Sequence, residues 1–143
     1  RTTGLLDFQQ PYTVMFWYSL AVNTGSSYQG ILTISSGGAS YDELHLDASG
    51  NLALECSGNS PTKVAGRLIQ ADRWQHIAIV RRSTSLMEVY VDGVLDISNA
   101  ANVSARNPAT ALHIARMENQ LRGIQVNLYA MLSIIQDSTA TEE

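Results

Sequence analysis

Short apolar stretches rich in β-branched and aromatic residues alternate with turn-forming residues along most of the chain. The stretch Tyr12–Leu20 is dense in such residues and ends at the polar, glycine-containing segment Asn23–Ser27. In Asp42–Asp47, polar and apolar residues alternate as they do in a strand with one buried face. Asp92 and Gly93 separate two apolar stretches, which is a strong short-range signal for a β-hairpin. The pattern therefore predicts antiparallel β-structure.

About eight to ten short strands are predicted, and no stretch has helical periodicity. Their ranges are Tyr12–Leu20, Ile31–Ser35, Asp42–Asp47, Leu52–Cys56, Val64–Ile69, Trp74–Arg81, Leu86–Val91, a strand that starts at Val94, Ala111–Ala115 and Gly123–Ile134. The turn residues Ala48–Asn51 predict that the strands on either side of them form a hairpin. Short strands separated by turns predict an all-β, two-layer antiparallel sandwich, formed by residues 1–143 as a single domain.

The two ends of the chain carry separate information. The sequence opens on Arg1 rather than on Met. The capping-box pattern Thr139–Glu142, which is typical of a helix N-terminus, lies one residue from the last position. We therefore expect this domain to be part of a longer chain or to be processed from one.

The composition excludes several classes of function. The net charge is −4 and only 15% of residues are charged, so the clustered Lys and Arg that neutralise nucleic-acid phosphates are missing. Ser, Thr, Asn and Gln supply 41 positions instead. No apolar run approaches the ~18 residues of a membrane span. Cys56 is the only cysteine, which excludes an intrachain disulfide and a cysteine-based zinc site. We expect neither nucleic-acid binding nor membrane insertion.

Three segments, in this order, resemble the laminin G-like domains of the concanavalin A-like lectin/glucanase superfamily. Tyr12–Tyr18 resembles their first core strand, in which an aromatic residue and Thr precede Phe-Trp. Trp74–Val80, followed by Val89–Gly93, resembles their Trp-x-His-apolar-Ala strand and Tyr-apolar-Asp-Gly hairpin. Leu112–Ala115 and Gly123–Leu132 resemble their closing pattern. The resemblance covers nearly the whole chain from the first motif onward, and it implies a jelly-roll of two curved antiparallel sheets.

The resemblance implies a range of functions and does not choose among them. Proteins of this superfamily bind glycans, mediate protein adhesion, hydrolyse glycosides or build virions. This chain departs from many members at Gln125 and Asn127, where they carry Asp. Its low charge favours neutral hydrogen-bonding surfaces. We predict a non-enzymatic recognition or adhesion domain that binds a glycan or a protein surface, located extracellularly or on a virion surface. The alternative is a virion structural protein, such as a capsid decoration or tail component, that holds neighbouring subunits together. A third hypothesis is a glycoside hydrolase.

The candidate ligand contacts are Met15, Trp17, His45, His76 and Tyr90. Strand alternation places Met15 and Trp17 on one face of the first strand. Aromatic residues on strands most often fill the core, so we predict that Trp17 and Trp74 are core residues. The alternative is that Met15 and Trp17 form an exposed contact surface. For His76, a structural hydrogen-bonding role beside the hairpin is the first interpretation and a ligand contact the second.

An alternating strand is the strongest enzyme signal in the sequence. Glu43, His45 and Asp47 share one strand face. Glycoside hydrolases of the superfamily carry alternating acids on a catalytic strand, and retaining hydrolysis needs two carboxylates roughly 5–5.5 Å apart. Here a histidine takes the middle position, so we favour a solvated polar face over catalysis.

Calcium is the possible cofactor. The resemblance implies a calcium ion held by loop oxygens near one rim, and Asp42, Asp47 and Asp96 are the candidate ligands. Asp92 is better explained as the turn residue of its hairpin. The histidines lie on different strands without metal-ligand spacing, so no zinc site is predicted.

Overall fold

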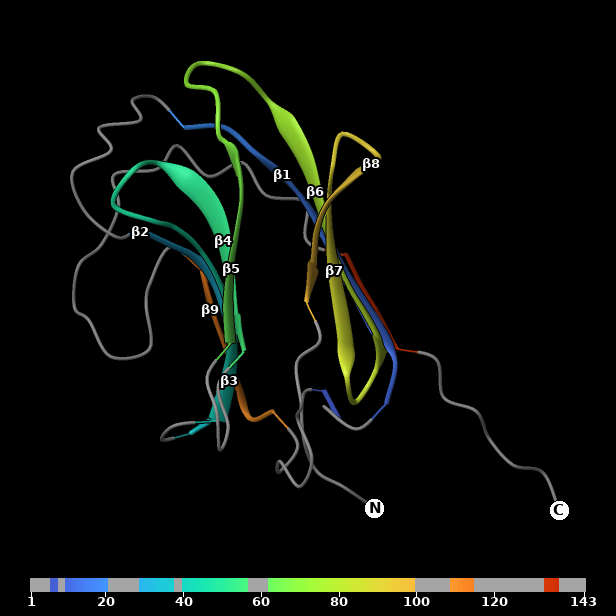
Figure 1. Cartoon of the computed structure of the whole chain (residues 1–143). Helices are drawn as coiled ribbons and strands as arrows, with labels where there is room; N and C mark the ends of the chain where they lie inside the picture. The colour runs from blue at the N-terminus through green and yellow to red at the C-terminus, as the bar shows by residue number, and fades with distance from the viewer. Residues whose placement is uncertain are drawn as a thin grey trace, which may run out of the picture.

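The computed structural model describes residues 6–7, 10–20, 29–37, 40–56, 62–99, 109–114 and 133–136. In this part of the chain, strands form two five-stranded antiparallel sheets and there is no helix (Figure 1). The first sheet has the strand order β10-β1-β6-β7-β8, and the second has the order β5-β4-β3-β2-β9. The strands are β1 (Tyr12–Tyr18), β2 (Gln29–Gly37), β3 (Ser40–Leu46), β4 (Asn51–Cys56), β5 (Thr62–Leu68), β6 (Gln75–Ser83), β7 (Leu86–Val91), β8 (Val94–Asn99), β9 (Ala111–Ile114) and β10 (Ser133–Gln136).

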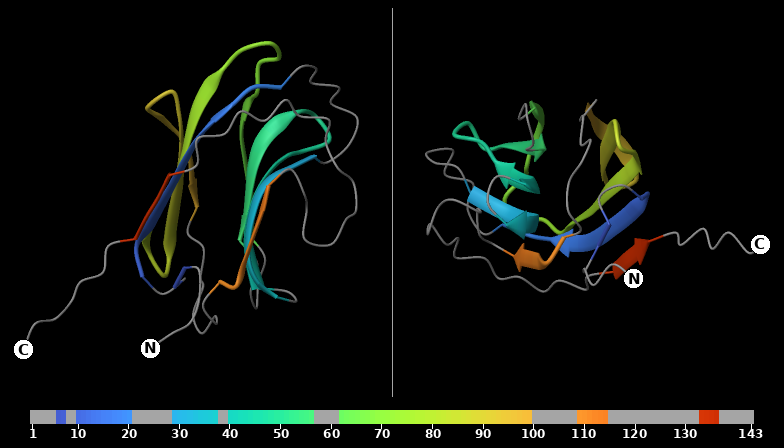
Figure 2. Two further views of the ribbon diagram at one scale, coloured as in Figure 1. Left: turned by 180° about the vertical axis from the view of Figure 1, so that it is seen from behind. Right: turned by 90° about the horizontal axis from the view of Figure 1, so that it is seen from below.

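The predicted all-β, two-layer antiparallel sandwich is confirmed. Figure 2 shows the layers edge-on, one with β1, β6 and β7 and the other with β2, β3 and β4. The chain changes sheets after β1, β5, β8 and β9, which produces the crossovers of a jelly-roll. A helix able to cross a membrane does not occur among the described residues. Residues 123–132 of the predicted last strand lie outside the described part, as do Gln125, Asn127 and the pattern Thr139–Glu142.

The core lies between the sheets. Side chains of β1, β6 and β7 alternate between buried and more accessible positions, so each strand turns one row of residues inward. In β1 the inward row is Tyr12, Val14, Phe16 and Tyr18. Burial of each large apolar side chain contributes about 1.5–3 kcal/mol, so these rows supply much of the driving force for folding.

The second sheet departs from the predicted half-buried pattern. In β3 both rows are buried, with Asp42, Glu43 and His45 only 3%, 2% and 1% exposed. The prediction of a solvated polar face is therefore wrong. The polar atoms of Glu43 are satisfied inside the protein instead: its carboxylate lies 3.2 Å from His45 Nδ1 and accepts a 3.1 Å hydrogen bond from the Thr33 hydroxyl. Paired polar groups tolerate burial that isolated ones do not.

One side of the sandwich is closed by the edge strands β5 and β8, which belong to different sheets and lie side by side. The Asp96 carboxylate of β8 accepts hydrogen bonds from the backbone N–H of Arg67 at 3.0 Å and from its Nε at 2.7 Å. The preceding residue, Gly66, makes this approach possible because a Cβ there would overlap the Asp96 carboxylate.

Candidate functional site

Four of the five candidate ligand residues gather on the outer face of the first sheet. Strand register places Trp17 of β1 opposite His76 of β6. In the neighbouring row, Met15 lies opposite Ala78, which lies opposite Tyr90 of β7. The four residues Met15, Trp17, His76 and Tyr90 are called the Trp17 face below. Their grouping follows from alternation along each strand and from the register between strands.

Trp17 is the most accessible member of this face. Its side chain is 49% exposed, and its ring meets the His76 ring in an edge-to-face arrangement with centroids 5.3 Å apart and planes at 67°. Trp74, just before β6, is 45% exposed. The core interpretation is therefore wrong for both tryptophans. Phe16 and Tyr18 already fill the inward positions of β1, and alternation turns Trp17 outward.

The β7–β8 hairpin fixes the position of His76. The Asp92 carboxylate accepts a 2.9 Å hydrogen bond from the His76 backbone N–H, and the Asp92 N–H donates to the His76 carbonyl at 2.8 Å. Asp92 and Gly93 have φ angles of 52° and 79°, so Asp92 is the turn residue that the sequence predicts. The structural role predicted for His76 is thus carried by its backbone, while its ring packs against Trp17.

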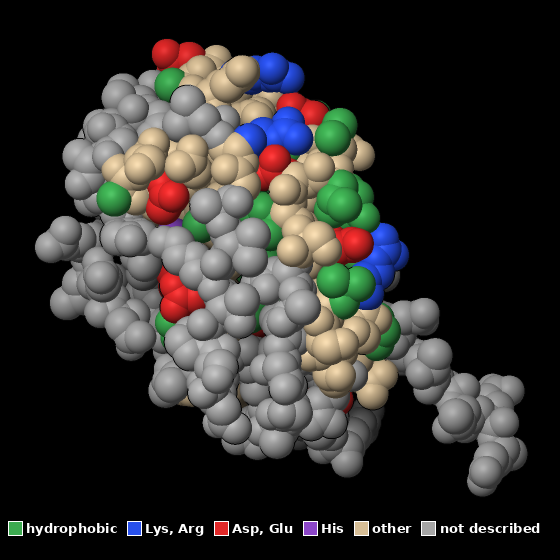
Figure 3. Space-filling view, viewed as in Figure 1, with side chains coloured by type: hydrophobic (Ala, Val, Ile, Leu, Met, Phe, Trp, Pro, Cys, Tyr) green, Lys and Arg blue, Asp and Glu red, His purple; other side chains and the backbone are tan. Residues whose placement is uncertain are grey.

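An ion pair between Arg82 and Glu88 borders the Trp17 face. Arg82 Nε donates to Glu88 Oε2 at 2.9 Å, and the Tyr90 hydroxyl donates to the same oxygen at 2.8 Å. The hydrogen bond from Arg82 is the main cause that lowers the pKa of Glu88. Figure 3 shows hydrophobic side chains beside blue and red ones on the side of the molecule that carries β7 and β8. Because the charges pair locally, the face offers aromatic and apolar surface without a net charge.

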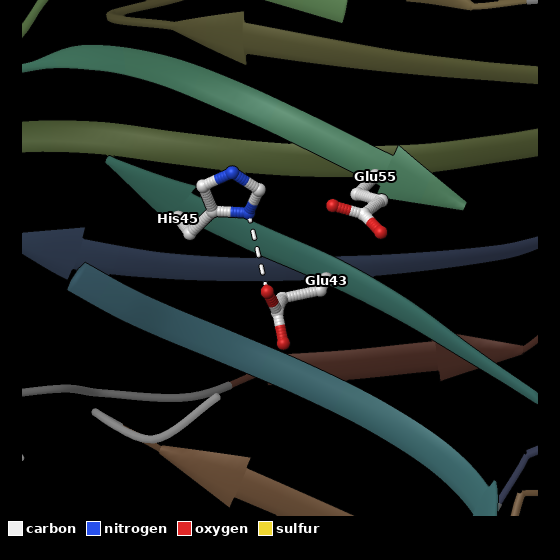
Figure 4. Close-up of side chains that lie close together, drawn as sticks. All are labelled: Glu43, His45 and Glu55. Atoms are coloured by element: carbon white, nitrogen blue, oxygen red, sulfur yellow. Dashed lines mark ion pairs between the residues drawn. The ribbon is translucent and has the colours of Figure 1, made fainter. Parts of the chain in front are cut away.

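The fifth candidate, His45, lies on the outer face of the second sheet with a different set of neighbours. Register places Glu43 of β3 opposite Glu55 of β4 and also opposite Thr33 of β2. Glu43, His45 and Glu55 each offer a ligand atom, and these atoms lie within 4.8 Å of one another (Figure 4). The Tyr41 hydroxyl donates to Glu55 Oε1 at 2.8 Å. We call Glu43, His45 and Glu55 the Glu43 cluster.

Glu55 was not among the site residues predicted from the sequence. The turn predicted at residues 48–51 would pair Asp47 with Leu52 and so set Glu43 opposite Cys56. The observed register differs by one residue and pairs Leu46 with Leu52, which sets Glu43 opposite Glu55. Asp47, by contrast, falls outside β3. Its carboxylate accepts hydrogen bonds from two backbone N–H groups of the β3–β4 turn, at 2.8 and 3.0 Å. The carboxylate pair weighed for glycoside hydrolysis, Glu43 and Asp47, is therefore not built as the sequence pattern indicated.

The proposed calcium ligands do not fit a single ion. Asp42 forms a buried ion pair with Arg81. Asp96 pairs with Arg67, and Asp47 caps its own turn. Among the described residues, these three carboxylates do not form a group with metal-ligand spacing. Calcium needs six to eight oxygens, roughly 2.3–2.6 Å away, and carboxylates used in separate contacts cannot supply them together.

A sequence comparison places the chain in a family. Residues 2–126 match the concanavalin A-like lectin/glucanases superfamily in its laminin G form. The chain belongs to this superfamily. The resemblance drawn from the Trp74–Gly93 region and its partner segments is thereby confirmed. No curated protein sequence matches the chain.

Solved structures similar to this concanavalin A-like domain include binding domains. The receptor binding domain of botulinum neurotoxin C/D mosaic serotype has a TM-score of 0.63 at 12% identity, covering 90% of this chain and 32% of that one. The Ruminococcus gnavus IT-sialidase CBM40 bound to α2,3-sialyllactose has a TM-score of 0.55 at 10% identity, covering 74% of this chain and 63% of that one. The binding domain of botulinum neurotoxin DC, in complex with rat synaptotagmin II, has a TM-score of 0.59 at 11% identity, covering 78% and 29%.

These similarities establish the shared fold. The chain spans about a third of the neurotoxin binding domains, at 32% and 29%, and 63% of the CBM40 chain. One neighbour is described with a glycan and another with a protein. A lectin-like fold is therefore the common element among these structures.

Proposed function

We propose that this concanavalin A-like domain is a non-enzymatic recognition domain that binds a neutral glycan on the Trp17 face. The observation that carries the proposal is the half-exposed Trp17 ring, held edge-to-face by His76 at the surface of a sheet. An indole fixed in one orientation offers a flat apolar surface to a sugar ring and loses little conformational entropy when the sugar binds.

The electrostatics of the face favour a neutral sugar over an acidic one. The cation in contact with this face is Arg82, and its guanidinium is already paired with Glu88 and the Tyr90 hydroxyl. An acidic sugar would have to break these contacts or bind beside the Glu88 carboxylate. The net charge of −4 works in the same direction because it disfavours anionic ligands.

The shared fold supports recognition as the general role, since neighbours of this architecture are binding domains. Catalysis has less support in the geometry. A sugar would have to contact the carboxylate of Glu43, which is 2% exposed. We place the domain extracellularly or on a virion surface, where glycans are displayed. The virion-structural alternative stays a prediction, and symmetric assembly of the domain into a larger lattice would be its test.

A glycan array with neutral and sialylated ligands tests the proposal. We expect binding to neutral glycans, and we expect Trp17→Ala to weaken it by about tenfold or more, as truncation of an aromatic anchor does at an interface. Trp17→Phe should retain part of the affinity because a ring remains.

The matched control is Ile114→Ala, which removes a similarly exposed apolar side chain (42%) from the second sheet. It should leave binding unchanged. The proposal would be overturned if the wild-type domain bound no glycan on the array, or if Trp17→Ala left its binding unchanged.

A further inference from the structure

We propose that the Glu43 cluster is a binding site for a divalent transition-metal ion of the zinc class, with Glu43, His45 and Glu55 as its protein ligands. The site lies on the outer face of the second sheet, so the proposal goes beyond glycan recognition and does not depend on the Trp17 face.

The geometry is close to that of a metal site. His45 Nδ1 and Glu43 Oε1 lie 3.2 Å apart. In a tetrahedral site with bonds of about 2.0–2.2 Å, two ligand atoms lie roughly 3.3–3.6 Å apart, and they can never be more than about 4.4 Å apart. The three ligand atoms of the cluster lie within 4.8 Å of one another, so the widest pair would have to close by at most about 1.5 Å to reach tetrahedral spacing. Figure 4 shows the three side chains pointing toward one another, two from β3 and one from β4.

The donor set selects the metal. One imidazole nitrogen and two carboxylate oxygens suit zinc and its neighbours in the first transition row, because imidazole binds these ions well. Calcium needs more oxygens and takes imidazole poorly. Three protein ligands leave a fourth coordination position for water or another ligand, and Glu55 is the most accessible of the three.

The surroundings hold the ligands in place. The Thr33 hydroxyl donates to Glu43 Oε2 at 3.1 Å, and the Tyr41 hydroxyl donates to Glu55 Oε1 at 2.8 Å. Outer hydrogen bonds of this kind orient carboxylate ligands in metal sites, and their removal typically weakens metal binding about 10–100-fold.

Charge also favours a cation here. Register places the carboxylates of Glu43 and Glu55 on adjacent strands, and Glu43 is 2% exposed. Two carboxylates so close repel one another in a weakly polar environment. A divalent ion bound here would balance both carboxylate charges at once.

Isothermal titration calorimetry of the chelator-treated domain with Zn²⁺ tests the proposal. We expect one ion per chain, and we expect Glu55→Gln and His45→Gln each to weaken binding about 100-fold or more, since each removes a ligand. Tyr41→Phe, which removes only an outer hydrogen bond, should weaken it by about tenfold. Co²⁺ should give visible absorption bands of a low-coordinate site that His45→Gln abolishes.

The matched control is His76→Ala, which removes an imidazole from the other sheet and should leave zinc affinity unchanged. Ca²⁺ should not compete. Because Glu55 is only half-buried, Glu55→Gln is expected to fold even if the His45 variant does not. Zinc affinity that is equal in wild type and Glu55→Gln, or that His76→Ala lowers as much, would overturn the proposal. Glycan binding is measured separately, so a failure of either proposal is distinguishable.

Discussion

Arg81 and Asp42 meet in the interior of the sandwich, one from each sheet. Their side chains are 0% and 2% exposed and form an ion pair, and the Tyr12 hydroxyl donates to the same Asp42 oxygen at 2.7 Å. The guanidinium also lies over the Tyr12 ring, 5.5 Å from its centroid. A charged group so far from water needs its partner, because the energy of desolvation is recovered only while the pair is intact.

Removal of the acid should therefore be costly. We expect Asp42→Ala to lower the free energy of unfolding by about 3–5 kcal/mol, because it leaves the Arg81 charge buried and uncompensated. Urea denaturation measures this. Arg67→Ala, which breaks an ion pair whose arginine is 39% exposed, is the control and should cost less than about 1 kcal/mol. Equal losses in the two variants would show that the interior pair has no special weight.

Two buried tyrosines should make the fold sensitive to alkali. Burial raises the pKa of Tyr12 and of Tyr18 above the ordinary value, and at Tyr12 the charge of Asp42 raises it further while Arg81 opposes. A raised folded-state pKa means that the unfolded chain loses its phenolic proton first. The free energy of unfolding is therefore unaffected by these groups below pH ~10, the pKa of a tyrosine in the unfolded chain. Above that pH it falls by up to about 1.4 kcal/mol per pH unit for each tyrosine.

Tyr18→Phe isolates one of these contributions. The Tyr18 hydroxyl is buried and has no hydrogen-bond partner among the described residues, so its removal should be tolerated at neutral pH. Urea unfolding at several pH values between about 8 and 11 should give a shallower loss of stability in this variant than in wild type. An unchanged slope would contradict the assignment.

Gly66 should resist even the smallest substitution. A Cβ at this position would overlap Asp96 and lie 2.8 Å from Ile97, so Gly66→Ala must push β5 and β8 apart. We expect a loss of about 1–3 kcal/mol in thermal or urea unfolding. In an Asp96→Ala background the same change should cost less, because part of the overlap is gone. Additive losses in this double-mutant cycle would show that the overlap is not the cause.

Alternation and turn chemistry in the sequence predicted the sandwich well, because both act over a few residues. The Asp92-Gly93 hairpin appears where predicted, the turn between β3 and β4 lies one residue from its predicted position, and most strand ends lie within two residues of the predicted ones. The burial of Glu43 and His45 could not be predicted. Alternation says which side chains share a face, whereas coverage of that face depends on residues distant in sequence.

The candidate site was predictable in its grouping and not in its exposure. Strand alternation in the sequence placed Met15 and Trp17 on one face, and the register seen in the structure adds His76 and Tyr90 to that face. Both faces of the first strand carry large apolar residues, so periodicity alone could not decide which face meets water. The Glu43 cluster needed the pairing of β3 with β4, which an antiparallel hairpin fixes only once the length of its turn is known.

The Trp17 face and the Glu43 cluster belong to the outer surfaces of opposite layers, with the whole core between them. A sugar on one surface cannot collide with an ion on the other, so their occupancies should be additive rather than competitive. Zinc would then raise the melting temperature by mass action while the sugar dissociation constant stays fixed. Metal binding to the second sheet would then stabilise the domain without altering the glycan specificity of the first sheet.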